Sequence, residues 1–109
     1  MPVSDGFIDF VIEQLGPVGP ITPKPMFGGV GLYVGDRFFG LVMDDVLYLK
    51  SDPWTRVARQ AVGARPFRPP NRPRGKGTNP YDSVPAAILE DADALIAWAR
   101  RSIAIASHG

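Results

Sequence analysis

Residues 26–50 read MFGGVGLYVGDRFFGLVMDDVLYLK, and this stretch decides the fold. Its apolar residues fall into three short runs, which are separated by Gly35-Asp36 and by Asp44-Asp45. Short alternating runs bounded by turn residues are typical of β-strands, and Gly-Asp supplies the positive φ that a two-residue hairpin turn requires. Strands joined this closely pair with their neighbours. The stretch therefore predicts an antiparallel three-strand meander.

Alternation along this meander assigns its side chains to two faces. We expect Leu32, Leu41 and Leu47 on the face that helices cover, with Phe39 and Met43 beside Leu41. A sheet face without helix cover favours a partner, and the commonest closed result is a two-fold homodimer. The candidate interaction face on the opposite side consists of Tyr33, Phe38, Val42 and Tyr48. Self-association is expected through this face or through a free strand edge.

Helices are predicted on both sides of the meander. Apolar residues at helical spacing after Ser4 predict a first helix that ends at Gly16-Pro17. Residues 17–25 contain four prolines and are predicted to be an extended connector. A last helical region begins at Pro85, and a break near Glu90 is expected because Asp91 can cap a new helix.

A further helix is predicted directly after the meander. The run Ser51-Asp52-Pro53 predicts its start, since a capping side chain is followed by proline at the first helical position. Gly63 is the expected C-terminal cap. The apolar residues at helical spacing predict its buried stripe, which consists of Trp54, Val57, Ala58, Ala61 and Val62.

Length and composition narrow the protein class. A chain of 109 residues is predicted to form a single domain over residues 1–109. There is no cysteine, which excludes disulfides and thiolate zinc sites. No apolar run approaches the roughly 20 residues of a membrane-spanning helix, and no signal-peptide pattern opens the chain. We therefore expect a cytoplasmic protein that does not enter the membrane.

The net charge of +1 conceals an uneven distribution. Five cations and no acid occur between Arg65 and Tyr81, which leaves a balance of −4 for the rest of the chain. This basic arm contains Arg65, Arg68, Arg72, Arg74 and Lys76. It is a candidate contact for nucleic acid or for an acidic partner. However, it lacks interleaved aromatic residues and a recognition helix, so a solvated cationic loop is favoured over nucleic-acid binding.

Candidate catalytic and metal-binding residues do not form a convincing constellation. The glycines of residues 28–31 precede a strand, whereas a phosphate loop leads into a helix. Asp44 and Asp45 are adjacent, so a turn is favoured over a converging acid–base pair. His108 is the single histidine and lies next to the C-terminal glycine. We predict a protein that is not an enzyme and that binds no cofactor or metal.

Several short motifs are shared, in the same order, with one family. They are Met26-Phe27-Gly28, Gly31-Leu32-Tyr33, Phe39, Leu47-Tyr48-Leu49-Lys50, Pro66-Phe67, Tyr81, Val84-Pro85, Leu89-Glu90-Asp91 and Trp98. In these features the chain resembles the TfoX N-terminal domain family, the front half of regulators of competence gene expression. It departs from the family at Pro25, which follows Lys24 where a basic residue usually precedes the Met-Phe-Gly. It departs again at residues 79–82, which replace a tyrosine-rich strand.

The resemblance implies an α+β fold of the secretion-chaperone-like class. In that fold helices pack on one face of a curved antiparallel sheet, here a three-strand meander plus an edge pair. Full-length competence regulators carry a second, C-terminal domain, and this chain ends where the first domain would end, so a stand-alone member is expected. The implied function is a regulatory or adaptor module in transcription regulation that acts by protein–protein interaction. The alternative is a nucleic-acid-associated protein that uses the Arg65–Lys76 arm.

Overall fold

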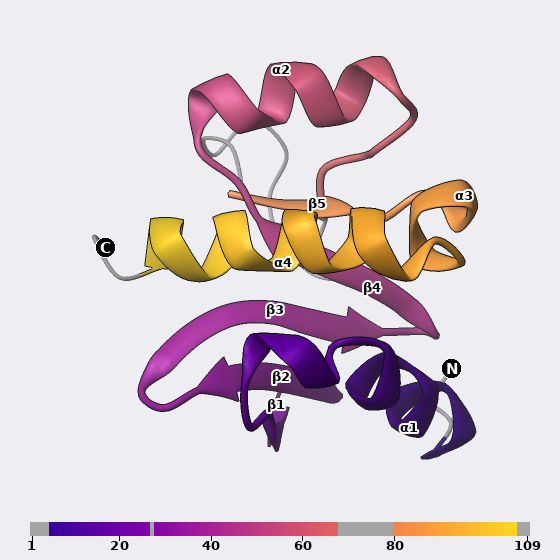
Figure 1. The fold of residues 1–109 in the computed structure, drawn as a ribbon, viewed down its shortest axis with the longest axis vertical. Coiled ribbons are helices and arrows are strands. Elements are labelled where there is room, and N and C mark those ends of the chain that lie inside the picture. The colour runs from indigo at the N-terminus through magenta and orange to yellow at the C-terminus, as the bar shows by residue number, and fades with distance from the viewer. Residues whose placement is uncertain (1–4, 27, 68–79, 107–109) are drawn as a thin grey trace.

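A five-stranded antiparallel sheet carries helices on one face (Figure 1). The computed structural model describes residues 5–26, 28–67 and 80–106. The elements are α1 (Asp5–Gln14), the 3-10 turn η1 (Gly16–Val18), β1 (Thr22–Met26), β2 (Gly29–Val34), β3 (Arg37–Met43), β4 (Val46–Lys50), α2 (Pro53–Ala61), β5 (Tyr81–Ser83), α3 (Ala86–Leu89) and α4 (Ala92–Ala106). The strands follow one another in chain order, which confirms the predicted α+β class and the meander.

Both hairpin turns of the meander form as predicted. Gly35 has a φ of 62°, which glycine adopts without steric cost. Asp44 and Asp45 have φ values of 53° and 59°, as a two-residue turn with two left-handed positions requires. Aspartate tolerates this region better than most residues, so the pair has the structural role that the sequence indicated.

β1 corrects the prediction of an extended connector. Its residues pair with β2 from Thr22 opposite Tyr33 to Met26 opposite Gly29. Pro23 and Pro25 are accepted because β1 is an edge strand. There the missing N–H groups can point away from the neighbouring strand.

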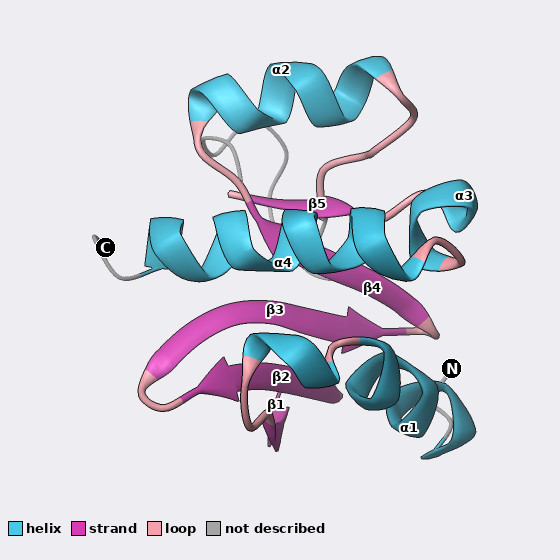
Figure 2. Cartoon of the chain, in the orientation of Figure 1, coloured by secondary structure: helices cyan, strands magenta, loops and turns pink. Residues whose placement is uncertain are grey.

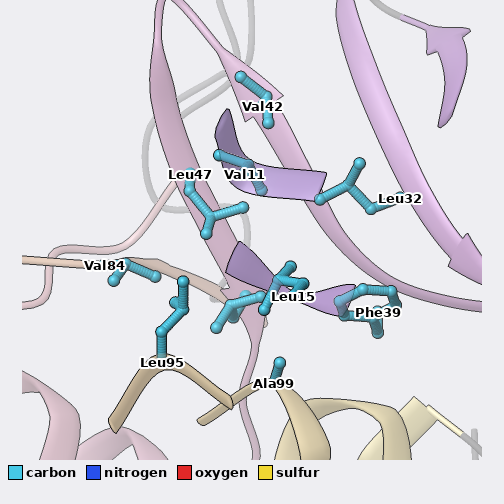
Figure 3. Packing of buried hydrophobic residues seen from close by; sticks show 10 residues of the cluster. Val11, Leu15, Leu32, Phe39, Val42, Leu47, Val84, Leu95 and Ala99 are labelled. Carbon is cyan, nitrogen blue, oxygen red and sulfur yellow. The ribbon is translucent and has the colours of Figure 1, made fainter. Parts of the chain in front are cut away.

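The main core lies between the sheet and the helices α1 and α4 (Figure 2). α1 contributes Val11 and Leu15, and α4 contributes Leu95 and Ala99. Figure 3 shows these side chains converging with those of the sheet, among them Leu32, Phe39, Val42, Leu47 and, beyond β5, Val84. The predicted positions of Leu32 and Leu47 on the helix-covered face are confirmed.

A bulge in β3 exchanges the predicted faces of its C-terminal half. Leu32 pairs with Gly40 and Tyr33 pairs with Phe38, so Phe39 is the extra residue. Phe39 and Val42 consequently both enter the core under the helices, while Leu41 lies on the opposite face. The predictions for Leu41, its neighbour Met43 and Val42 were therefore wrong, because strict alternation does not anticipate a bulge.

The break in the C-terminal helical region is confirmed. α3 ends at Leu89, and α4 begins at Ala92. The carboxylate of Asp91 accepts a hydrogen bond from the backbone N–H of Ala94 at 3.2 Å. This bond satisfies one of the free donors at the start of α4.

Candidate interaction surfaces

The outer side of α2 exposes apolar side chains. Trp54 is 84% exposed, Val57 72% and, at the C-cap, Val62 58%. The alanines between them on this side, Ala58 and Ala61, are exposed as well. We call these five residues the α2 stripe. The prediction that they form a buried face was wrong, and the opposite side of the helix faces the protein.

The inner side of α2 is polar, and Arg56 anchors it to β5. The Arg56 guanidinium donates from Nε to both oxygens of Asp82, at 3.1 and 3.0 Å, and from Nη2 to Oδ1 at 2.9 Å. Gln60 donates to the same Oδ1 at 3.3 Å. The Asp82 side chain is fully buried, whereas that of Arg56 is 17% exposed. This forked geometry satisfies a buried carboxylate.

Arg59 ties α2 to β4 and α4. Its guanidinium donates to the backbone oxygens of Lys50 and Trp98, each at 2.9 Å, and to Ser51 Oγ at 3.2 Å. It also stacks 4.9 Å from the centre of the Trp98 ring. Burial lowers the pKa of Arg59 to about 10, although Asp82 opposes the shift. The side chain therefore remains charged at neutral pH and donates to these oxygens, of which Lys50 O also accepts from Ser102 Oγ at 2.8 Å.

The N-terminus of α2 is fixed by the predicted cap. Asp52 accepts hydrogen bonds from the backbone N–H of Thr55 at 2.7 Å and from its hydroxyl at 2.6 Å. Arg101 of α4 pairs with the other carboxylate oxygen at 3.1 Å. The hydrogen bonds from Thr55, and secondarily the charge of Arg101, lower the pKa of Asp52. Together with Arg56 and Arg59, this cap sets which side of α2 faces outward.

The sheet face opposite the helices carries an aromatic face, which we define as Tyr33, Phe38 and Tyr48. Tyr33 stacks on Phe38 at 5.1 Å, and Tyr48 meets Phe67 edge-on at 4.8 Å between ring centres. All three residues are half-buried, and Phe38 and Tyr48 pack against a buried cluster of Leu41, Met43, Phe67 and Tyr81. Val42, the fourth predicted member, lies instead in the core under the helices.

Burial also governs the ionisation of two tyrosines on this side of the sheet. Burial, with a smaller effect of Tyr33, raises the pKa of Tyr81 to about 12. Burial, followed by the charge of Asp44, raises the pKa of Tyr48. The Lys24 ammonium lies over the Tyr33 ring, 4.7 Å from the ring centre. The rings thus cover one another, and the aromatic face offers less free apolar surface than predicted.

The outer edges of the sheet offer few backbone donors to a partner strand. On β5, Ser83 donates its N–H to Arg65 O at 2.7 Å, and Phe67 donates to Tyr81 O at 2.8 Å. Residues 65–67 therefore cover this edge of the sheet. On β1, Pro23 and Pro25 have no N–H. This arrangement disfavours self-association through a strand edge.

The basic arm is described only at its start. Arg65 is exposed, and its backbone N–H donates to Ser83 Oγ at 2.9 Å. Arg68, Arg72, Arg74 and Lys76 lie outside the described residues, as does His108. Within residues 5–26, 28–67 and 80–106, no three or more His, Cys, Asp or Glu side chains gather as metal ligands would. In the same ranges, no helix has the length and apolar character needed to cross a bilayer.

Comparison with known proteins agrees with the order of motifs and elements. Residues 13–106 match the TfoX N-terminal domain, so the match spans the chain from the end of α1 to the end of α4. No curated protein matches the chain. Because the match covers far more than half of the sequence, the chain belongs to the TfoX N-terminal domain family.

Proposed function

We propose that this domain is a non-enzymatic regulatory or adaptor module that acts by binding protein through the α2 stripe. Membership of the family supports a competence-regulator-like domain. The observation that carries the protein-binding role is the outward placement of Trp54, which is 84% exposed beside Val57 and Val62. The proposal places the domain in the cytoplasm, where a transcription regulator meets its partners.

Physical chemistry supports a binding role for this stripe. Burying apolar surface in an interface contributes a favourable free energy of about 25 cal/mol for each Å² removed from water. Tryptophan is enriched among the residues that dominate protein–protein binding. The stripe also has a fixed support, because Arg56 and Arg59 hold the inner side of α2 by six hydrogen bonds. A further hydrogen bond, from Gln60, reaches the same carboxylate that Arg56 binds.

Site-specific photo-crosslinking tests the proposal. A photoreactive amino acid replaces Val57 in the native cell, and the same amino acid replaces Phe10 of α1 as the matched control. Both positions are apolar, helical and exposed, at 72% and 38%. We expect a protein adduct, with this chain or with another, from position 57 and none from position 10. Absence of any adduct from position 57 contradicts the proposal.

The alternative function, nucleic-acid association through the Arg65–Lys76 arm, has its own test. Binding to duplex DNA is measured across a series of salt concentrations. Five phosphate contacts would give a log–log salt slope of at most about −4.5. We expect no binding at physiological salt. Binding there that is lost on neutralising Arg72, Arg74 and Lys76 would favour the alternative over the adaptor role.

A further inference from the structure

We propose that the occupant of the α2 stripe is a second copy of this chain, with the two α2 helices antiparallel about a two-fold axis. The inference rests on the proposed function, since it names the partner of the same surface. Two features of the stripe support a self-complementary pairing: its lack of charge and the order of large and small side chains along it. A third feature, its area, limits how strong the pairing can be.

The first feature is the absence of charge from the stripe. In a two-fold interface, a residue close to the axis meets its own copy, so any charge there faces a like charge. The five stripe residues are all apolar. The charged residues of α2, Arg56 and Arg59, lie on the inner side and are engaged with Asp82 and with backbone oxygens. Two copies can therefore approach without electrostatic repulsion between their stripes.

The second feature is the order of side-chain sizes. Trp54 stands at the start of α2, and the small Ala61 lies seven residues later, about 10.5 Å along the axis. In an antiparallel pair, each indole ring then lies over Ala61 of the other helix. The two-fold axis passes midway between Trp54 and Ala61, at Val57 and Ala58, where small side chains let the two helices come close. The stripe thus offers a bulky group and a matching gap to its own copy.

The third feature is the area of the stripe. A tryptophan buries on the order of 150–250 Å², and the exposed valines and alanines bring the stripe to roughly 400 Å² per copy. A standard stable interface buries about 800 Å² per partner. The stripe therefore supplies the apolar centre of a small interface, which predicts a reversible dimer that forms at high micromolar concentration.

Charge variants at the axis give a test that is specific for a two-fold pairing. Val57→Lys and Val57→Asp each place like charges opposite one another, whereas an equal mixture of the two variants places opposite charges together. Val57 is 72% exposed, so both variants should fold with an unchanged melting temperature. Phe10→Lys is the matched control on α1. Sedimentation equilibrium, from micromolar to several hundred micromolar protein, measures the association.

We expect the wild type and Phe10→Lys to approach twice the 11.8 kDa mass of the monomer. Each Val57 variant alone should lose about tenfold or more in association constant, and the mixture should recover it. A wild type that is monomeric at every concentration would overturn the inference. So would an association constant that neither Val57 variant lowers, or one that stays low when the two variants are mixed. If position 57 crosslinks to a different protein while the purified chain stays monomeric, the inference fails and the proposed function stands.

Discussion

The salt bridge between Arg56 and Asp82 carries the strongest prediction about how α2 is held. Removing Arg56 leaves the Asp82 carboxylate without exposed surface. Among the described residues, Gln60 then still donates a side-chain hydrogen bond to it, at 3.3 Å. Breaking a buried ion pair from one side costs about 3–5 kcal/mol. Arg56→Ala should therefore lower the free energy of unfolding by that amount. A domain has about 5–15 kcal/mol of stability in total, so the loss is a large fraction of it.

The reverse substitution should cost less. Asp82→Ala strands Arg56, whose side chain is 17% exposed and long enough to turn its guanidinium into water. We expect a loss of about 1–3 kcal/mol, the usual cost of lost buried hydrogen bonds. The double variant removes both charges. It should be more stable than Arg56→Ala alone, because no buried carboxylate is then left without its partner.

Urea unfolding followed by far-ultraviolet circular dichroism measures all three variants. The protein concentration is kept low, so that association does not contribute to stability. Arg100→Ala is the control, since Arg100 is exposed and, within the described ranges, donates one hydrogen bond, at 3.3 Å, to Pro17 O. It should change stability by about 0.5 kcal/mol or less. A loss below about 1 kcal/mol for Arg56→Ala, or a double variant less stable than Arg56→Ala, would refute this account of the polar anchor.

Three further predictions follow from burial and ionisation. Leu41→Ala should cost about 2–5 kcal/mol in urea unfolding, because Leu41 is 5% exposed, whereas Val57→Ala should cost about 0.5 kcal/mol or less. Since the pKa of Tyr81 is raised from 10.0 to about 12, its contribution to stability is complete below pH 10 and is lost as the pH rises towards 12. Tyr81→Phe should remove this late step from the absorbance titration of the phenolates. The lowered pKa of Asp52 acts in the opposite sense: its contribution is present above the ordinary value of 3.8 and is lost as the pH falls through the folded value, so Asp52→Asn should flatten the acid limb of the stability profile.

Local signals in the sequence predicted most of the fold. The two turns, the cap at Asp52 and the break before Asp91 each depend on a few adjacent residues, and each is present in the structure. β1 was missed because its two prolines oppose a strand in isolation, and only its position at an edge makes them acceptable. The bulge at Phe39 was missed because alternation counts residues and contains no information about register.

Gly40 is the one sequence feature that could have indicated the bulge. A β-carbon at this position would lie 2.9 Å from Tyr48 O and 3.0 Å from a methyl of Leu49. Glycine inside a strand often marks a bulge or a close backbone approach. Read in that way, Gly40 would have moved Phe39 and Val42 to the same face and Leu41 to the other, as the structure has them.

The orientation of α2 was unpredictable for a different reason. Its sequence has two well-separated sides, and periodicity defines those sides without saying which one faces the protein. The usual assumption is that the apolar side is buried. Here the surface beneath α2 presents acceptors for donors on the helix, namely the fully buried Asp82 carboxylate and the part-buried backbone oxygens of Lys50 and Trp98. Only the arginine side of the helix supplies those donors.

The same requirement explains why the α2 stripe remains accessible. If α2 rotated to bury Trp54 and Val57, Arg56 and Arg59 would turn outward, and Asp82 would be left buried and unpaired. Burying a single apolar side chain stabilises a protein by about 1.5–3 kcal/mol, whereas stranding one buried carboxylate costs about 3–5 kcal/mol. Each of the three hydrogen bonds that Arg59 donates would add about 0.5–1.5 kcal/mol to that cost. The rotation thus offers no clear gain, and the polar anchor keeps the apolar stripe outward. Trp54, Val57 and Val62 therefore remain exposed in the described structure.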